Sequence, residues 1–164
     1  MLYLAMLLTA GAIVGLDQFT KYLTVSHIPE GGVIPVWPGV FHLTYIRNSG
    51  AAFSMLEGAR ILFLLLTLLF LAGAVACIVK KKIRHPLGQW ALVLVAGGAV
   101  GNLIDRMAYG SVVDMIELEF MRFAIFNVAD CFVTVGAALL IVWAIFLDRR
   151  KPGAPEGTAH DDTL

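Results

Sequence analysis

Charged side chains are scarce in this chain. Lys and Arg number 12 and Asp and Glu number 12 among 164 residues, which is 15% of the sequence. A water-soluble globular domain carries about 25% charged residues. The formal net charge is zero, so no overall field attracts nucleic acid, and we expect no nucleic-acid partner.

Several common catalytic and metal-binding patterns are also missing. Cys77 and Cys131 lie in apolar stretches without the spacing of a zinc site or a disulfide framework, which is typical of small buried side chains. No H-E-x-x-H motif is present, so a zinc protease is disfavoured and we expect no metal or other cofactor. Ser49 and His42 share one loop, but the G-x-S-x-G motif of many serine hydrolases is absent.

Long apolar runs are the main feature of the chain, which is 59% hydrophobic. A helix that crosses a bilayer needs about 20 mostly apolar residues. Four such stretches occur, at about 2–22, 60–79, 87–107 and 124–147. Backbone groups within lipid must be bonded inside their own segment, so these stretches must be helices. The sequence therefore predicts an all-α membrane domain, a bundle of four transmembrane helices, over residues 1–147.

Basic residues near the spans predict the orientation, because cytoplasmic loops carry an excess of Lys and Arg. They occur in the link Lys80-Lys81-Lys82-Ile83-Arg84-His85-Pro86 and after the fourth span, at Arg149, Arg150 and Lys151. We therefore expect both termini in the cytoplasm, and the loops 23–59 and 108–123 outside. The polar tail, residues 148–164, is typical of a disordered segment.

The first outer loop contains a segment typical of a β-strand. Residues 40–46 are rich in β-branched and aromatic side chains with partial alternation. Turn-forming residues precede this segment, at Gly31-Gly32, Pro35 and Pro38-Gly39. The pattern predicts a strand at the membrane surface.

Polar side chains gather at one level of the predicted bundle. They occur at the outer ends of the first, third and fourth spans and in the loop that joins the last two: Asp17, Gln18, Lys21; Asn102, Asp105, Arg106; Asn127, Asp130; and Asp114. Ionisable groups in a membrane are costly and usually functional. Four segments therefore predict one shared site just below the outer surface.

The balance of charge in this cluster distinguishes two of its aspartates from the other two. Structural ion pairing is an alternative for Asp17 with Lys21, and for Asp105 with Arg106. The four aspartates face only these two cations, so two carboxyl groups are in excess, and we expect them to be Asp114 and Asp130. Two close carboxyl groups in a low dielectric share a proton. The protonated one can donate to a carbonyl oxygen while the other takes a proton from water, which hydrolyses an amide.

Five segments resemble, in order, the motifs of the lipoprotein signal peptidase (signal peptidase II) family. They are Asp17-Gln18-Phe19-Thr20-Lys21, Asn48-Ser49-Gly50-Ala51-Ala52-Phe53, the run from Gly97 to Arg106 (G-G-x-x-G-N-x-x-D-R), Val112-Val113-Asp114, and Phe126-Asn127-Val128-Ala129-Asp130. The resemblance covers most of the chain, from Asp17 to Asp130.

The resemblance implies an intramembrane aspartyl endopeptidase of the bacterial inner membrane, with its active site near the extracytoplasmic face. Its substrate would be a prolipoprotein with diacylglycerol on a cysteine, cut just before that cysteine. It implies that Asp114 and Asp130 are catalytic and that Asp17 and Lys21 support the fold. The residues implied to shape the site or bind substrate are Asn48, Gly50, Asn102, Asp105, Arg106 and Asn127. The implied fold adds a small extracytoplasmic β cradle to the bundle.

Composition adds two expectations about the site and its partners. Phe53, Met55, Met115, Ile116 and Phe120 are predicted to form its apolar walls. The loop 108–123 is predicted to close over it as a lid. We expect a monomer whose partners are its substrate and membrane lipids.

A small ion- or proton-coupled transporter is the alternative function. A transport path needs polar groups near the midplane and beyond. The inner halves of the four spans carry almost no charge, so the alternative is disfavoured.

Overall fold

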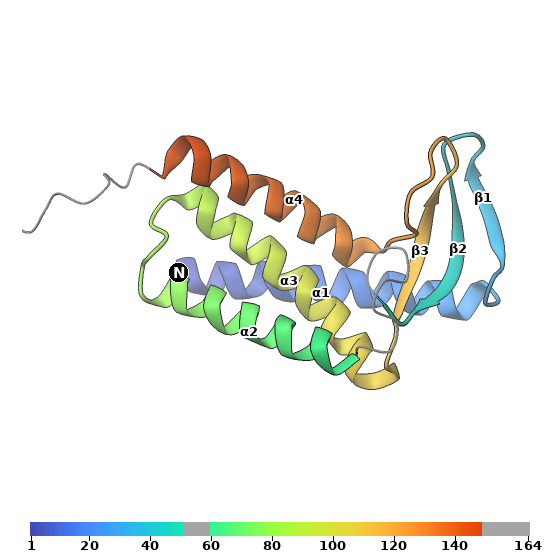
Figure 1. The fold of residues 1–164 in the computed structure, drawn as a ribbon, viewed down its shortest axis with the longest axis horizontal. Coiled ribbons are helices and arrows are strands. Elements are labelled where there is room, and N and C mark those ends of the chain that lie inside the picture. The colour runs from blue at the N-terminus through green and yellow to red at the C-terminus, as the bar shows by residue number, and fades with distance from the viewer. Residues whose placement is uncertain (51–59, 149–164) are drawn as a thin grey trace, which may run out of the picture.

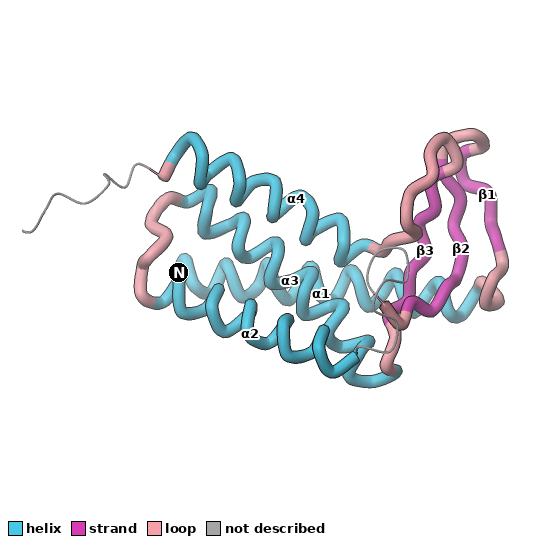
Figure 2. Tube along the Cα trace, in the orientation of Figure 1, coloured by secondary structure: helices cyan, strands magenta, loops and turns pink. Residues whose placement is uncertain are grey.

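The computed structural model describes residues 1–50 and 60–148. The predicted wall residues Phe53 and Met55, the end of the Asn48–Phe53 motif, and the tail beyond residue 148 lie outside the described residues. Four helices run side by side, and a small sheet stands across one end of them (Figures 1 and 2). The first helix begins, and the fourth ends, at the other end.

The four predicted helices are present, and each is long and apolar enough to cross a membrane. They are α1 (Leu2–His27), α2 (Arg60–Val79), α3 (Pro86–Tyr109) and α4 (Val128–Val142), which continues as the π-helix η2 (Trp143–Leu147). Helix α3 contacts each of the other three, and it has the largest buried share. In α2 only Ala74 is buried, so the apolar surface of α2 suits contact with lipid.

Two helix boundaries differ from the prediction by four or more residues. Helix α1 continues to His27, five residues past the predicted end. Helix α4 begins at Val128 rather than at 124, because Asn127 is its N-cap and Phe126 forms a β-bridge with Ile116. The apolar run therefore begins in extended chain, which hydropathy does not distinguish from helix.

The sheet has three antiparallel strands in the order β1-β2-β3. They are β1 (Val33–Trp37), β2 (Phe41–Asn48) and β3 (Val112–Leu118). The predicted strand is β2. Pro35 was expected in a turn but lies in β1, an edge strand, where a missing N–H is tolerated.

Asp114 lies in strand β3, which corrects its expected place in a loop. It pairs with Ile46 of β2. Val113 and Met115 on either side of it are buried against Ile28 and Tyr45. Residues 112–118 of the predicted lid, 108–123, therefore form a strand bonded into the sheet, and the first four of them are buried.

Close approach of α3 and α4 depends on glycine. A Cβ atom on Gly98 would meet the carbonyl oxygen of Ala129, and one on Gly136 would lie 2.8 Å from the carbonyl oxygen of Ala91. Small residues at such crossings let two backbones come together. The same crossing carries Asp130 at the start of α4, so these glycines also set the position of the site.

We expect Gly98→Ala to lower the melting temperature of the protein in detergent, by a change equivalent to about 1–3 kcal/mol, because the added methyl group overpacks the crossing. Gly73→Ala is the matched control, since a Cβ atom there has no neighbour within 4 Å. Equal melting temperatures for the two variants would contradict the proposed packing constraint.

Candidate active site

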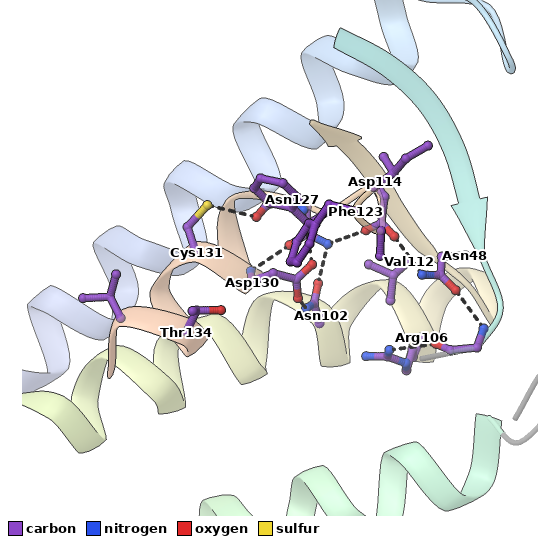
Figure 3. Close-up of a pocket in the computed structure, with 15 residues that line it drawn as sticks. Asn48, Asn102, Arg106, Val112, Asp114, Phe123, Asn127, Asp130, Cys131 and Thr134 are labelled. Carbon is purple, nitrogen blue, oxygen red and sulfur yellow. Dashed lines mark hydrogen bonds between the residues drawn. The ribbon is translucent and has the colours of Figure 1, made fainter. Parts of the chain in front are cut away.

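Five of the nine clustered polar residues line a cavity of about 560 Å³ where the bundle meets the sheet (Figure 3). Its polar lining comes from β2, α3, β3 and the start of α4. The predicted residues in this lining are Asn48, Gly50, Asn102, Arg106, Asp114, Asn127 and Asp130. Asp17, Lys21 and Asp105 are not in the lining.

Asp114 reaches the cavity from β3 and is only 3% exposed. One carboxylate oxygen accepts a hydrogen bond from Nδ2 of Asn48 at 2.8 Å, and the other accepts one from Nδ2 of Asn127 at 2.7 Å. Burial raises the pKa of Asp114 to about 6, and the charge of Asp130 adds to the increase, against the lowering effect of the two amides. This carboxyl group is therefore partly protonated near neutral pH.

Asp130 is held in the first turn of α4 by a capping box. The Asn127 side chain accepts a bond from the backbone N–H of Asp130 at 3.0 Å, and Asp130 Oδ2 accepts one from the backbone N–H of Asn127 at 3.2 Å. The other oxygen, Oδ1, accepts a bond from Nδ2 of Asn102 at 2.8 Å. Helix capping thus fixes the carboxylate at the cavity wall.

The amide of Asn127 connects the two aspartates. Its side chain is fully buried. Nδ2 donates to Asp114 Oδ1 at 2.7 Å and to Asn102 Oδ1 at 3.1 Å, while Oδ1 caps the helix at Asp130. One asparagine therefore sets the position of Asp114 relative to Asp130, as the dashed lines in Figure 3 show.

A buried ion cluster lies behind the cavity. The ammonium group of Lys21 is 2.9 Å from Asp17 Oδ2 and 3.0 Å from Asp105 Oδ2, and it donates to Asn102 Oδ1 at 2.8 Å. All three ammonium donors of Lys21 therefore have partners. Gln18 adds a hydrogen bond to Asp105 Oδ1 at 2.8 Å. The alternative of a structural ion pair is correct for Asp17 with Lys21.

The two acids of this cluster also hold the segments that carry the other two aspartates. Asp17 Oδ1 accepts a bond from the backbone N–H of Ala129 at 2.9 Å. Asp105 Oδ2 accepts one from the backbone N–H of Val113 at 3.1 Å. Each bond ends one residue before an aspartate of the cavity, so the cluster positions both Asp114 and Asp130.

Asp105 and Arg106 do not pair with each other, which corrects the second ion-pair alternative. Neighbours in a helix point in different directions, so Asp105 meets Lys21 while Arg106 lines the cavity. The Arg106 guanidinium lies 5.0 Å from the ring centre of Phe63 and donates to the Gly50 carbonyl at 3.4 Å. Arg106 is therefore the cation of the cavity itself.

The charge balance leaves two acids without an ion pair. Lys21 is shared by Asp17 and Asp105, and across residues 1–50 and 60–148 no salt bridge involves Asp114 or Asp130. Their oxygens are instead bonded to amides. This arrangement suits a pair of carboxyl groups that shares one proton.

Three of the predicted wall residues lie elsewhere. Met115 and Ile116 line a separate cavity beside α1, and Phe120 lines a third, next to His42. Side chains alternate along a strand, so Met115 points away from the face that carries Asp114. The apolar lining instead consists of Val112, Phe123, Ala124, Ile125, Phe126, Cys131 and Val135, none of which was predicted as a wall residue.

The serine hydrolase alternative has no geometric support. Nε2 of His42 is 2.7 Å from Glu117 and Nδ1 is 3.1 Å from Glu119. Both ring nitrogens are therefore occupied by carboxylates of β3 and the residue after it. His42 has no nitrogen left for Ser49.

Comparison with known proteins places this chain in a family. A family model described as signal peptidase (SPase) II matches residues 9–146. The chain belongs to the signal peptidase II family. The match contains every predicted site residue, and members of this family are proteases.

Named relatives support this assignment, and two solved structures share the fold. The lipoprotein signal peptidase of Brevibacillus brevis is 44% identical over 144 residues, which cover 88% of this chain and 96% of the relative. That of Streptococcus thermophilus is 46% identical over 131 residues, 80% and 86% of the two chains. Two bacterial membrane enzyme structures solved by the in meso method align with TM-scores of 0.82 and 0.79, at 33% and 35% identity. They cover 94% and 88% of this chain, and 94% of each solved chain.

We expect Lys21→Met to destabilise the protein by about 3–5 kcal/mol, because it leaves Asp17 and Asp105 buried without their cation. Thermal unfolding in detergent measures the loss. Lys80→Met is the matched control, since Lys80 is exposed and should change stability by no more than about 0.5 kcal/mol. Similar unfolding temperatures for both variants would contradict the role of the cluster.

Proposed function

We propose that this chain is an intramembrane aspartyl endopeptidase that removes the signal peptide of diacylglyceryl-modified prolipoproteins, cutting just before the lipidated cysteine. The observation that carries the proposal is the buried pair Asp114 and Asp130, linked by one asparagine and lacking an ion pair in the described residues. Relatives named lipoprotein signal peptidase support this substrate class.

In the proposed mechanism the two carboxyl groups share one proton. The ionised carboxylate takes a proton from a water molecule, and that water attacks the scissile carbonyl carbon. The protonated carboxyl group donates to the carbonyl oxygen, which gives a tetrahedral diol. The first carboxyl group then passes its proton to the leaving nitrogen and the C–N bond breaks. A hydroxyl group of the diol returns its proton to the second carboxylate as the product carboxyl group forms, so the pair regains its starting state.

Asp114 is our candidate for the protonated member. Its pKa of about 6 comes first from burial, which disfavours the ionised form. A bound substrate would exclude more water from the cavity and favour the protonated form further. Asp130 also accepts two hydrogen bonds, but it differs from Asp114 in lying in the first turn of α4, where the helix N-terminus favours a carboxylate.

The remaining cavity residues would hold the substrate backbone. Asn48 and Arg106 lie on the Asp114 side, and the Arg106 guanidinium can stabilise negative charge on the scissile carbonyl oxygen. Gly50 accepts from Arg106 and so fixes its direction. The apolar side of the cavity follows α4 through Cys131 and Val135, which suits a signal peptide or acyl chains lying against that helix.

The basic link between α2 and α3 lies at the end of the bundle opposite the sheet, beside the end of α4. The excess of positive charge in cytoplasmic segments supports placing this end in the cytoplasm and the sheet with the active site outside. A multi-pass protein of the bacterial inner membrane with both termini inside fits this orientation. A monomer is sufficient, since one chain supplies both aspartates.

Cleavage of a diacylglyceryl-modified prolipoprotein by the purified protein tests this function. We expect Asp114→Asn and Asp130→Asn each to lower the rate by roughly 10²–10⁴-fold, because an amide cannot exchange the proton that general acid–base catalysis requires. Asp148→Asn, at the opposite end of the bundle, is the matched control and should keep the wild-type rate. A chelator should change none of these rates. Full activity in both folded site variants would overturn the proposal.

The pH dependence of cleavage should have a limb near pH 6, because the pKa of Asp114 is raised to about 6. The rate should fall as pH rises through this limb, since Asp114 then loses the proton it donates. Asn48 donates a hydrogen bond that lowers this pKa. Asn48→Ala should therefore raise the pKa and move the limb to higher pH, whereas Glu117→Gln should leave it in place. A shift to lower pH in Asn48→Ala would reject Asp114 as the acid.

A further inference from the structure

A second polar cavity, of about 830 Å³, lies at the end of the bundle away from the sheet. It opens between the α2–α3 link and the end of α4, which are neighbours in Figure 1. Its lining is Lys80, Lys81, Lys82, Arg84, His85, Pro86, Trp143, Leu147 and Asp148. Three lysines and one arginine therefore line it, together with the one carboxylate of Asp148. The proposed peptidase reaction uses none of these residues.

The backbone at the end of α2 fixes where these lysines stand. The N–H of Lys82 bonds to the Cys77 carbonyl at 2.9 Å, and the N–H of Lys81 bonds to the Ile78 carbonyl at 3.1 Å. These two bonds form a Schellman motif, which requires a left-handed residue at the position of Lys81. Lys81 adopts that conformation, with φ of 51°.

The end of helix α2 does not require a lysine at position 81. Glycine adopts the left-handed conformation without the steric cost that a side chain brings. Lysines also offset a helix dipole and mark a cytoplasmic loop, but they can do both from neighbouring positions with ordinary backbone angles. The Lys81 side chain therefore points to a local role for its charge.

The link that carries the cationic side chains is anchored to the bundle. Ile83, in the middle of the link, is buried against Ala74 and Leu92, and Trp143 packs against the same cluster. Gln89 holds the Ile83 carbonyl with a hydrogen bond of 3.0 Å. Trp143 also begins the π-helix, a widened turn of a kind that is frequent at functional sites. The cationic side chains are thus carried on ordered backbone.

The cavity combines this charge with apolar surface. Trp143, Leu147 and Pro86 line it together with the cations. Val79, which precedes Lys80, is 66% exposed, and Phe146, which precedes Leu147, is 70% exposed. Both lie on helix faces that suit contact with lipid. A soluble phosphate would bind the cations but leave this apolar surface unused, whereas an amphiphile would use both.

We propose that this cavity binds the phosphodiester headgroup of an anionic phospholipid, with its acyl chains along the exposed apolar faces of α2 and α4. Basic pockets between membrane helices bind such headgroups. The site lies at the end of the bundle opposite Asp114 and Asp130, so the proposal does not depend on the peptidase activity.

Native mass spectrometry of the full chain in neutral detergent tests the proposal, with dioleoylphosphatidylglycerol and dioleoylphosphatidylcholine as probes. We expect the wild type to prefer phosphatidylglycerol. The double variant Lys81→Gly, Arg84→Gln should bind it about 25-fold more weakly, at roughly fivefold for each cation removed. Arg122→Gln removes one charge at the sheet end and should change nothing. Lys81→Arg should keep the preference.

The stability of Lys81→Gly separates charge from folding. Glycine relieves the left-handed backbone, so the lipid-free melting temperature should stay level or rise while phosphatidylglycerol binding weakens. Equal binding of the two lipids by the wild type, or an unchanged preference in the double variant, would overturn the site. Competition by soluble glycerophosphate as strong as that of phosphatidylglycerol would overturn its assignment to a lipid.

Discussion

The buried ammonium group of Lys21 is the interaction on which the site geometry depends. It pairs with both Asp17 and Asp105, 2.9 and 3.0 Å away. These two acids can then accept backbone N–H groups one residue before Asp130 and Asp114. Three buried charges cost desolvation energy, which complete pairing and hydrogen bonding offset. The cluster joins α1, α3, β3 and α4 at one point, so the bundle and the sheet meet where the two aspartates must lie.

The same pairing explains why the other two aspartates are available for acid–base chemistry. Because Lys21 is used by its own two acids, Asp114 and Asp130 are bonded to amides instead of a cation, as the proposed sharing of one proton requires. Asn127 divides its amide between them and ties a strand to a helix cap. A purely structural cluster would have no use for two acids held open to a cavity of about 560 Å³.

The sequence alone predicts the features that depend on composition and helix spacing. Apolar length indicates the four helices, and the position of polar groups near their outer ends brings Asn102 and Asp130 to one level. It does not reveal that Lys21 also meets Asp105, because that contact depends on the direction of α1 against α3. The sequence predicts a loop at Asp114, because a short segment between two spans carries too little periodicity to indicate a strand. It also places Met115 in the wall of the active-site cavity, because the alternation of side chains between the two faces of a strand can be applied only when the strand is recognised.

Isotope-edited infrared spectroscopy of the protein, with 13C-labelled aspartate, tests the central claim most directly. If Asp114 and Asp130 share a proton, a protonated carboxyl band should persist above the range of ordinary aspartates and disappear around pH 6, where the Asp114 pKa lies. The band should be absent from Asp114→Asn. A wild-type spectrum in which every aspartate is ionised well below this pH, near about 4, would contradict the account.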